Sequence, residues 1–278
     1  MSERPHLSVS QLEMFAKCPE SWRRRYLEKE IIPPRLAMLK GSAVHAGAEF
    51  NMKQKIESGV DLPPDEIIDA SVNAFEEKIK RDSYTLGDGE SKANVSDYKE
   101  LVVTLAEAHA AEQAPNYQPV EVERKFTIEL PSISHDLVGV IDLVDDKGTV
   151  VDFKTAGKSM PADEAEKSIQ LGVYAAQQDS DVVNVRLDVL VEPTARRGVV
   201  RQVIDSVRDK TELPIIARRV SVVSKTIDAG LFPPAPVGSW WCSEGWCGYW
   251  SSCPYVNAER IQANREVKKA IEVLEKGI

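Results

Sequence analysis

Residues 139–154 read GVIDLVDDKGTVVDFK, and this stretch decides the fold. Two apolar runs flank a turn at Asp145–Gly148, a pattern that predicts a β-hairpin. Asp142 lies inside the first run, and the second run ends in Asp152–Lys154. Charge in a buried strand is costly unless it is paired or binds a metal ion. Two carboxylates beside a lysine therefore suit metal-assisted hydrolysis, and an ion pair on a surface hairpin is the alternative interpretation.

The composition of the chain indicates a globular protein, which we expect to be cytoplasmic. Its 278 residues, 42% of them hydrophobic, suffice for one large domain or for one domain with a small appendage. No run approaches the roughly 20 apolar residues of a membrane span. The polar N-terminus also lacks the apolar segment of a signal peptide.

The net charge of −9 argues against a broad basic face for nucleic acid, because phosphate binding needs lysine and arginine. Short arginine clusters still leave room for a local DNA track. The alternative for each cluster is a solvated surface. The candidates are Arg23, Arg24, Arg25, Arg196 and Arg197.

The hydrophobic periodicity changes along the chain from that of helices to that of strands. A capping box at Ser10 and Glu13 begins the first helix. Helices are expected at residues 10–26, 41–58, 62–79, 94–113, 163–178, 209–228 and 256–276, with a loop at 87–89. Strands are expected at residues 120–130, 137–144, 149–154, 182–192 and 198–205. One face of the helix at 62–79 is expected to be buried, and it carries Ile68, Val72, Phe75 and Ile79. One face of the strand at 120–130 is also expected to be buried, and it carries Val120, Val122, Phe126, Ile128 and Leu130.

This order of elements indicates an α/β protein whose sheet core follows an N-terminal helical cap. We expect a single domain over residues 1–278. Residues 1–115 form its helical part, 116–206 its catalytic sheet, and 207–278 its C-terminal helices and cysteine-rich segment.

Two further motifs carry polar groups that a site could use. The stretch GSAVH at residues 41–45 places His45 at the start of a predicted helix, where it could lie beside a metal ion. Gln170 and Tyr174 are one helical turn apart, so an amide and a phenol share one face and could hold a nucleotide or Lys154. Alone, each motif is better explained by an ordinary helix, with His45 packed or exposed as a bystander and Tyr174 in the core.

Four cysteines form the last candidate site, and three of them lie within 12 residues. A reducing compartment makes two structural disulfides an unlikely use for them. Four thiolates are what a structural zinc ion or a [4Fe–4S] cluster requires, and free buried thiols are the third alternative. The cysteines are Cys18, Cys242, Cys247 and Cys253. Nearby aromatic side chains either pack around this site or form a stacking platform for bases: Trp240, Trp241, Trp246, Tyr249 and Trp250.

Taken together, the motifs GSAVH, VERKF, GVIDLV, VVDFKTA and QLGVY occur in one order. In that order the chain closely resembles the PD-(D/E)XK nuclease superfamily, in particular its RecB-like branch. The opening LSVSQLEMFAKCPESWRRRYL resembles the start of the same branch. The resemblance runs from about residue 7 to residue 255 and implies a restriction-endonuclease-like core, in which helices flank a mixed central sheet.

The resemblance also implies a role for each matching position. Mg²⁺ or Mn²⁺ would be bound by His45, Asp142, Asp152 and the backbone carbonyl of Phe153. Lys154 would be the catalytic lysine. Glu123 fits the glutamate on the strand before the metal-binding aspartate better than Glu121 does. Gln170 and Tyr174 would contact DNA near the active site.

The cysteines resemble those of a subset of this branch, the AddB-type repair nucleases and the CRISPR-associated exonucleases. There one cysteine in the first helix and three near the C-terminus bind a [4Fe–4S] cluster. Cys18 would be the first, and Cys242, Cys247 and Cys253 the triad. The spacing here is C-x4-C-x5-C, whereas the subset usually has C-x2-C-x5-C.

The sequence thus indicates a metal-dependent DNA exonuclease with an iron–sulfur cluster. The resemblance favours single-stranded DNA ends as substrate, and partner proteins in recombination, repair or CRISPR-like adaptation. No G-x-x-x-x-G-K-[ST] motif of a helicase motor occurs. The alternatives are a flap or structure-specific endonuclease, a DNA-end-binding subunit with a vestigial nuclease site, and a redox or interaction protein centred on the cysteines.

Overall fold

The computed structural model describes residues 4–81, 84–86, 91 and 94–256. The predicted loop at 87–89 and all but the first residue of the helix predicted at 256–276 lie outside these residues. The chain divides into two compact units. The sheet unit comprises Met1–Leu12 and Pro33–Lys225, and the cysteine unit comprises Glu13–Ile32 and Thr226–Ile278. A single domain over 1–278 stays a prediction.

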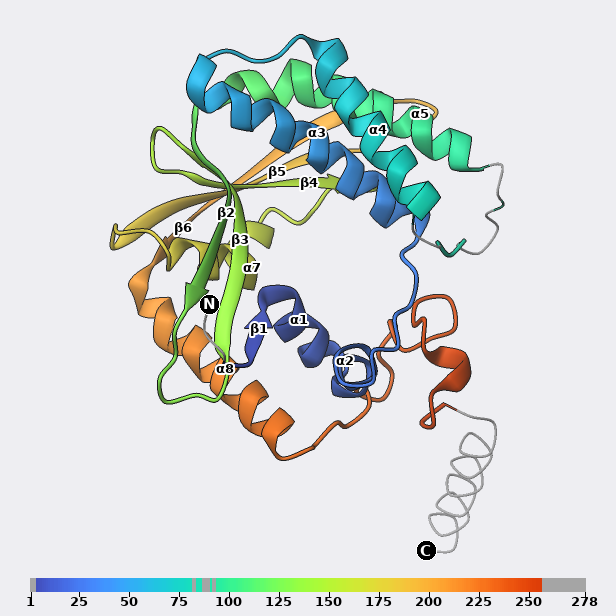
Figure 1. Ribbon diagram of the computed structural model, residues 1–278, viewed down its shortest axis with the longest axis vertical. Helices are drawn as coiled ribbons and strands as arrows, with labels where there is room; N and C mark the ends of the chain where they lie inside the picture. The colour runs from blue at the N-terminus through green and yellow to red at the C-terminus, as the bar shows by residue number, and fades with distance from the viewer. Residues whose placement is uncertain (1–3, 82–83, 87–90, 92–93, 257–278) are drawn as a thin grey trace, which may run out of the picture. The chain divides into compact units, whose positions relative to one another are not determined.

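A six-stranded mixed sheet forms the centre of the sheet unit (Figure 1). Its main path runs β1-β3-β4-β5-β6, and β2 pairs with β3 as well. The β1–β3 and β4–β5 pairs are parallel, and the other pairs are antiparallel. The strands are β1 (His6–Ser8), β2 (Pro119–Ile128), β3 (Asp136–Asp145), β4 (Val150–Ala156), β5 (Val182–Val191) and β6 (Val200–Asp209). This mixed sheet confirms the predicted α/β class.

Helices lie on both sides of this sheet, with α3, α4 and α5 on one side of β4 and β5 and α7 on the other (Figure 1). No described helix is both long enough and apolar enough to cross a membrane. The α-helices are α1 (Val9–Lys17), α2 (Pro19–Tyr26), α3 (Leu36–Ser58), α4 (Pro64–Arg81), α5 (Asn94–Ala108), α6 (Glu164–Lys167), α7 (Ile169–Ala175) and α8 (Leu213–Asp228). A π-helical turn at His109–Gln113 continues α5.

Two of the predicted helices are broken in the structure. The helix predicted from Ser10 to Tyr26 is split into α1 and α2 by Pro19, which cannot donate a backbone hydrogen bond inside a helix. The cap of α1 is Ser8, whose Oγ accepts from the Gln11 N–H at 3.2 Å, so the predicted cap at Ser10 is wrong. The helix predicted at 163–178 is split at Ser168, whose Oγ caps α7.

Two expected buried faces also differ from the structure. Val120 is 51% exposed, because a register shift between Pro119 and Glu121 turns it away from the core. On α4 the fully buried positions are Ile67, Ser71 and Phe75, so the expected face is displaced by one residue over its first two turns.

The face of the sheet under α3 carries two separate apolar clusters. One is formed by Leu39, Ala43, Val44, Phe75, Val102, Leu105, Ala108 and Leu190. The other is formed by Ala48, Met52, Ala114, Tyr117, Leu143, Val151 and Phe153. Because α3 contributes residues to both clusters, they fix its position over the sheet.

The cysteine unit has an aromatic core of its own. Trp22 of α2 is 3% exposed and packs against Phe15 and Phe232, with ring centroids 5.7 Å and 6.1 Å away. The N–H of Glu20 donates to the Pro233 carbonyl at 3.2 Å. These contacts join the start of the chain to the segment that follows α8.

Gly47 lets α3 and α4 cross closely. A Cβ atom at this position would overlap the Ser71 side chain and lie 2.8 Å from the Ile67 carbonyl oxygen. A side chain can move, but a helix backbone carbonyl moves only if the helix shifts. Gly47 therefore determines how near α4 approaches the helix that carries His45.

We predict that Gly47→Ala lowers the free energy of unfolding by about 1–3 kcal/mol, because it overpacks this crossing. Urea denaturation followed by circular dichroism would measure the change. Gly157→Ala is the matched control, since a Cβ there would meet no atom within 4 Å. Equal unfolding free energies for the two variants would contradict the prediction.

Candidate active site

The site lies where β3 and β4 separate. These strands pair only at Leu143↔Val151 and Val144↔Val150. Beyond these pairs Asp142 and Asp152 lie at the fork, where the Phe153 N–H donates to Asp142 Oδ2 at 3.1 Å. Asp152 is 1% exposed, which does not fit the alternative of a surface hairpin. The fork therefore holds two carboxylates in a buried setting.

His45 and Glu123 meet Asp142 at this fork. His45 reaches it from α3, and its Nε2 lies 2.8 Å from Glu123 Oε1 and 3.7 Å from Asp142 Oδ2. One ligand atom from each of the three residues lies within 4.8 Å of the other two, a spacing that a single metal ion could bridge. One imidazole and two carboxylates suit a divalent cation that prefers oxygen ligands.

The backbone of Glu123 is in an unusual conformation. Its φ is 51°, in the left-handed region that residues other than glycine rarely adopt. Such strain persists only where the surroundings impose it, and it is common at functional sites. The competing Glu121 instead pairs with Arg124 at 2.7 Å. The structure thus brings Glu123, and not Glu121, to His45.

Asp152 and Lys154 form a second group with two residues of α7. Lys154 Nζ lies 2.8 Å from Asp152 Oδ2 and donates to Gln170 Oε1 at 3.2 Å. Gln170 Nε2 donates to Asp152 Oδ1 at 3.1 Å and to the Tyr174 hydroxyl at 2.6 Å. In this arrangement the amide and phenol position the lysine, which is one of the two roles expected from the sequence.

The start of α7 is held from two directions. Ser168 Oγ accepts from the Leu171 N–H at 3.2 Å, which caps the helix. The buried Arg208 of β6 donates to the Ser168 carbonyl at 2.8 Å. Gln170 therefore lies in the first turn of a helix with a fixed starting point.

At the fork, acidic side chains are more numerous than basic ones. Burial and the neighbouring Asp152 carboxylate raise the pKa of Asp142 to about 8. Burial alone would lower the pKa of His45, but its hydrogen bond to Glu123 and the nearby carboxylates raise it to about 9. At neutral pH the imidazolium of His45 therefore provides the positive charge that a metal ion would otherwise supply.

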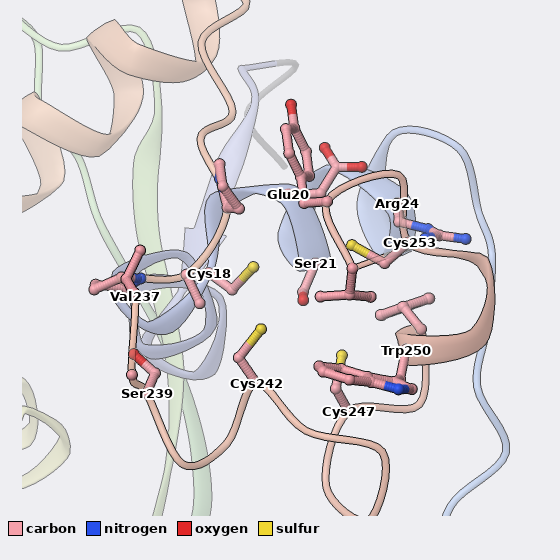
Figure 2. A pocket seen from close by; sticks show the side chains of 17 residues that line it. Cys18, Glu20, Ser21, Arg24, Val237, Ser239, Cys242, Cys247, Trp250 and Cys253 are labelled. Atoms are coloured by element: carbon pink, nitrogen blue, oxygen red, sulfur yellow. The ribbon is translucent and has the colours of Figure 1, made fainter. Parts of the chain in front are cut away.

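The four cysteines surround a cavity within the cysteine unit (Figure 2). The cavity measures about 350 Å³, and the sulfur atoms of all four are directed toward a common open space. Burial and the neighbouring thiols raise the pKa of Cys242, and burial raises that of Cys247. The structure thus brings together cysteines that lie more than 200 positions apart in the sequence.

The aromatic residues of this segment have different environments. Tyr249 and Trp250 line the cysteine cavity, in agreement with a packing role. Trp240 and Trp246 are 63% and 64% exposed, and their ring centroids are 4.9 Å apart.

The candidate DNA-binding arginines fall into two groups. Arg23 pairs with Glu20 and Glu28, and Arg24 pairs with Glu30 at 2.7 Å. The glutamates neutralise these two charges within the cysteine unit, and Arg25 lies over the Tyr26 ring. Arg196 and Arg197 are exposed in the turn between β5 and β6.

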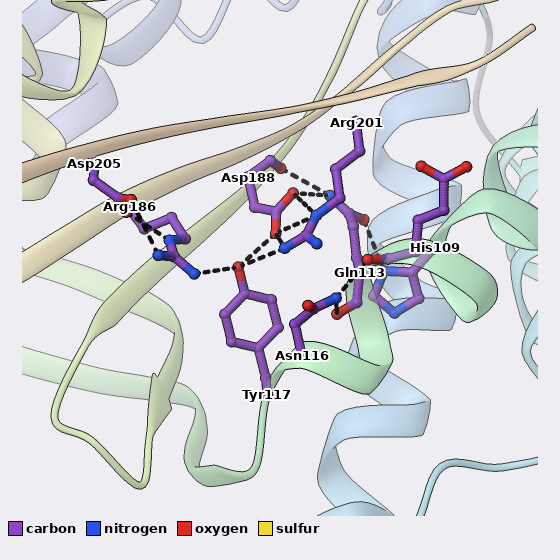
Figure 3. Close-up of polar contacts among 9 residues, drawn as sticks. His109, Gln113, Asn116, Tyr117, Arg186, Asp188, Arg201 and Asp205 are labelled. Carbon is purple, nitrogen blue, oxygen red and sulfur yellow. Dashed lines mark hydrogen bonds and ion pairs between the residues drawn. The ribbon is translucent and has the colours of Figure 1, made fainter.

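Reasoning from the sequence did not single out a buried polar network around Asp188 (Figure 3). Its partners are Gln113, Tyr117 and Arg201. The sequence does contain a sign of this network, because Asp188 interrupts the mostly apolar run VRLDVLV just as Asp152 interrupts its own strand. His109 and Gln113 lie one helical turn apart, as Gln170 and Tyr174 do.

Comparisons with known proteins bear on this geometry. A sequence model described as the PD-(D/E)XK nuclease superfamily matches residues 6–254. The crystal structure of a Eubacterium rectale protein that is provisionally described as an exonuclease is similar in fold. The TM-score is 0.51 and the identity 14%, over 85% of this chain and 86% of that chain. The crystal structure of SSO0001 has a TM-score of 0.42 and 12% identity, over 93% of this chain and 90% of that chain. A search of curated proteins found no match.

We predict that the affinity of this site for Mn²⁺ rises with pH, because the metal competes with protons on Asp142 and His45. The affinity should increase about tenfold or more per pH unit between about pH 6 and pH 8, and level off once both groups are deprotonated. Calorimetry in buffers of different ionisation enthalpy would also measure the protons released. An affinity independent of pH over this range would contradict the prediction.

Proposed function

This chain belongs to the PD-(D/E)XK nuclease superfamily, and we propose that it is a metal-dependent exonuclease acting on single-stranded DNA ends. A nuclease of this superfamily hydrolyses phosphodiester bonds. The observation that carries the proposal is the fork itself. Asp142, Asp152 and Lys154 lie there together with His45 and Glu123.

The residues at the fork fit Mg²⁺ or Mn²⁺. The raised pKa values of Asp142 and His45 mark a cluster of carboxylates that a divalent cation would neutralise. His45, Glu123 and Asp142 would hold the ion, and in our proposal Asp152 and the backbone carbonyl of Phe153 would be its further ligands. A bound divalent cation would supply Lewis-acid stabilisation of the charge that develops on the phosphate.

The other residues of the fork would orient the reactants. Lys154 is held by Asp152 and Gln170, so its ammonium group has a fixed place from which to orient water and offset phosphate charge. Tyr174 keeps Gln170 in place, because the phenol accepts a hydrogen bond from the amide. Burial raises the pKa of Tyr174 above its usual range, so it stays a neutral phenol.

The exonuclease activity and the preference for single-stranded ends rest on the resemblance to the RecB-like branch. The family model over residues 6–254 supports the nuclease part of the proposal. We place the DNA track near Arg196 and Arg197, whose charges are exposed. A role in recombination, repair or CRISPR-like adaptation, with partner proteins of those pathways, is part of the same proposal.

We predict that Lys154→Ala and Asp152→Asn each lower the rate of DNA cleavage by about 100-fold or more, because the first removes the ammonium group that orients water and the second removes a proposed metal ligand that also holds Lys154. End-labelled single-stranded and duplex DNA, with Mg²⁺ or Mn²⁺, would measure the rate and the polarity. Lys158→Ala and Asp146→Asn are matched controls, since both side chains are exposed outside the fork.

Two outcomes would contradict this function. DNA binding without cleavage by the folded, metal-loaded protein would indicate the DNA-end-binding subunit. Cleavage within a closed circle or at a flap, and not from ends, would indicate the structure-specific endonuclease.

We further propose that the four cysteines bind a [4Fe–4S] cluster, as in the AddB-type subset. The support is their spacing in the structure. A tetrahedral zinc site with Zn–S bonds of about 2.3 Å holds its sulfurs roughly 3.8 Å apart. Among the described residues, only His45, Glu123 and Asp142 have three ligand atoms within 4.8 Å of one another, so no three of the sulfurs are that close. A four-iron cluster separates its cysteines more widely, because each thiolate binds a different corner.

We predict that protein purified without oxygen is brown and contains about four irons and four sulfides per chain. Cys18→Ser should remove the colour and lower the stability of the cysteine unit, because the cluster closes a very long loop. Metal analysis, electron paramagnetic resonance and thermal unfolding would measure these effects. Ser251→Ala, at an exposed serine of the same segment, is the control. A colourless, folded protein with one zinc ion per chain would contradict the proposal.

A further inference from the structure

Asp188 is the centre of a buried polar network in the sheet unit (Figure 3). It is 0% exposed and lies in the apolar strand β5. Arg201 pairs with it at 2.6 Å, Gln113 Nε2 donates to Oδ1 at 2.9 Å, and the Tyr117 hydroxyl donates to Oδ2. A carboxylate with this many donors fixes the orientation of each of them.

The orientation of Gln113 determines which nitrogen of His109 carries the proton. The Gln113 amide donates to both the main-chain carbonyl and the Oδ1 of Asp188, each at 2.9 Å. Its Oε1 can therefore only accept, and His109 Nδ1 lies 2.9 Å from it. His109 Nδ1 must then carry a hydrogen atom. In the neutral ring, Nε2 then has a free lone pair that can accept a hydrogen bond.

This Nε2 atom has no hydrogen-bond partner among the described residues, although His109 is only 1% exposed. No dashed line reaches it in Figure 3. Leaving a buried acceptor unpaired is unfavourable, because the hydrogen bond it makes with water in the unfolded chain is not replaced. Buried polar groups of this kind are usually satisfied by protein or by ordered water.

A small cavity adjoins His109 on the side of the candidate active site. Its volume is about 20 Å³, and His109, His45, Lys154 and Thr155 are among the residues that line it. A cavity needs about 10–15 Å³ and two to four polar partners to hold one water molecule. This cavity meets both conditions.

We propose that this cavity holds one ordered water molecule, which donates to His109 Nε2 and accepts the Nδ1–H of His45. The inference rests on the proposed function, since it concerns the residue that would bind the metal. Nε2 of His45 faces Glu123 and Asp142, which leaves its Nδ1 for a second hydrogen bond. A histidine that binds a metal usually gives its other N–H to a carboxylate, a carbonyl or a water.

His109 is then a positioning residue for His45. A continuous series of hydrogen bonds runs from Asp188 through Gln113 and His109 to the water and to His45. With a hydrogen atom fixed on Nδ1 of His45, its Nε2 is the nitrogen directed at the two carboxylates, and it can bind a metal ion once it has lost its own proton. The buried network of β5 would thereby set the orientation of a ligand on α3.

Two measurements on the metal-free, wild-type protein test the water directly. Long-range ¹H–¹⁵N NMR should show the His109 proton on Nδ1 and a bare Nε2. A high-resolution crystal structure should show one water within hydrogen-bond distance of His109 Nε2 and of His45. A proton on Nε2, or a dry cavity, would overturn the proposal. Because neither measurement needs DNA or metal, its outcome is independent of whether the protein proves to be a nuclease.

The positioning role is tested by Mn²⁺ binding to the full chain, measured by electron paramagnetic resonance. His109→Phe keeps a ring in place but removes the acceptor, and it should weaken Mn²⁺ binding about tenfold. Gln113→Leu should weaken it less, and NMR should then show both tautomers of His109. His135→Phe, at a buried histidine outside this cavity, is the control and should bind Mn²⁺ normally. Unchanged affinity in a folded His109→Phe protein would overturn the role.

Discussion

The repulsion among three carboxylates at one fork of a buried sheet is the constraint on which the rest of the structure depends. Glu123, Asp142 and Asp152 approach one another where burial limits how far solvent screens their charges, so each needs a fixed cation or donor nearby. His45 and Lys154 supply the positive charge. They come from different elements, so α3 and β4 must both be held accurately.

The surroundings provide that accuracy in several separate ways. Two apolar clusters place α3, and Gly47 sets its distance from α4. The capped start of α7 places Gln170 against Lys154. The strained backbone of Glu123 also contributes to this accuracy. Its unfavourable φ is retained because it directs the Glu123 carboxylate toward His45.

Much of this arrangement could be predicted from the sequence, because it depends on local periodicity. The apolar runs around Asp145–Gly148 predict the hairpin, and Asp142 and Asp152 are conspicuous as charges within them. The break at Pro19 is a local signal that the expectation of one continuous helix overlooked, whereas the break at Ser168, the register shift before Glu121 and the displaced face of α4 could not be placed. Each of these depends on a tertiary contact or on competition between local signals, as when Ser71 meets Gly47 across two helices.

The comparison of Asp152 with Asp188 shows why partners decide the role of a buried charge. Both interrupt apolar strands, and the sequence alone gives no reason to separate them. Asp188 has Arg201, Tyr117 and Gln113 as its own partners, so its charge is matched within the fold. Asp152, Asp142 and Glu123 are three carboxyl groups at one fork, and only two basic groups, His45 and Lys154, lie near them. An unmatched cluster can gain free energy from a bound cation, whereas a matched one can only orient its neighbours. The two networks therefore suit different tasks, one to bind a metal ion and the other to position the histidine that would hold it.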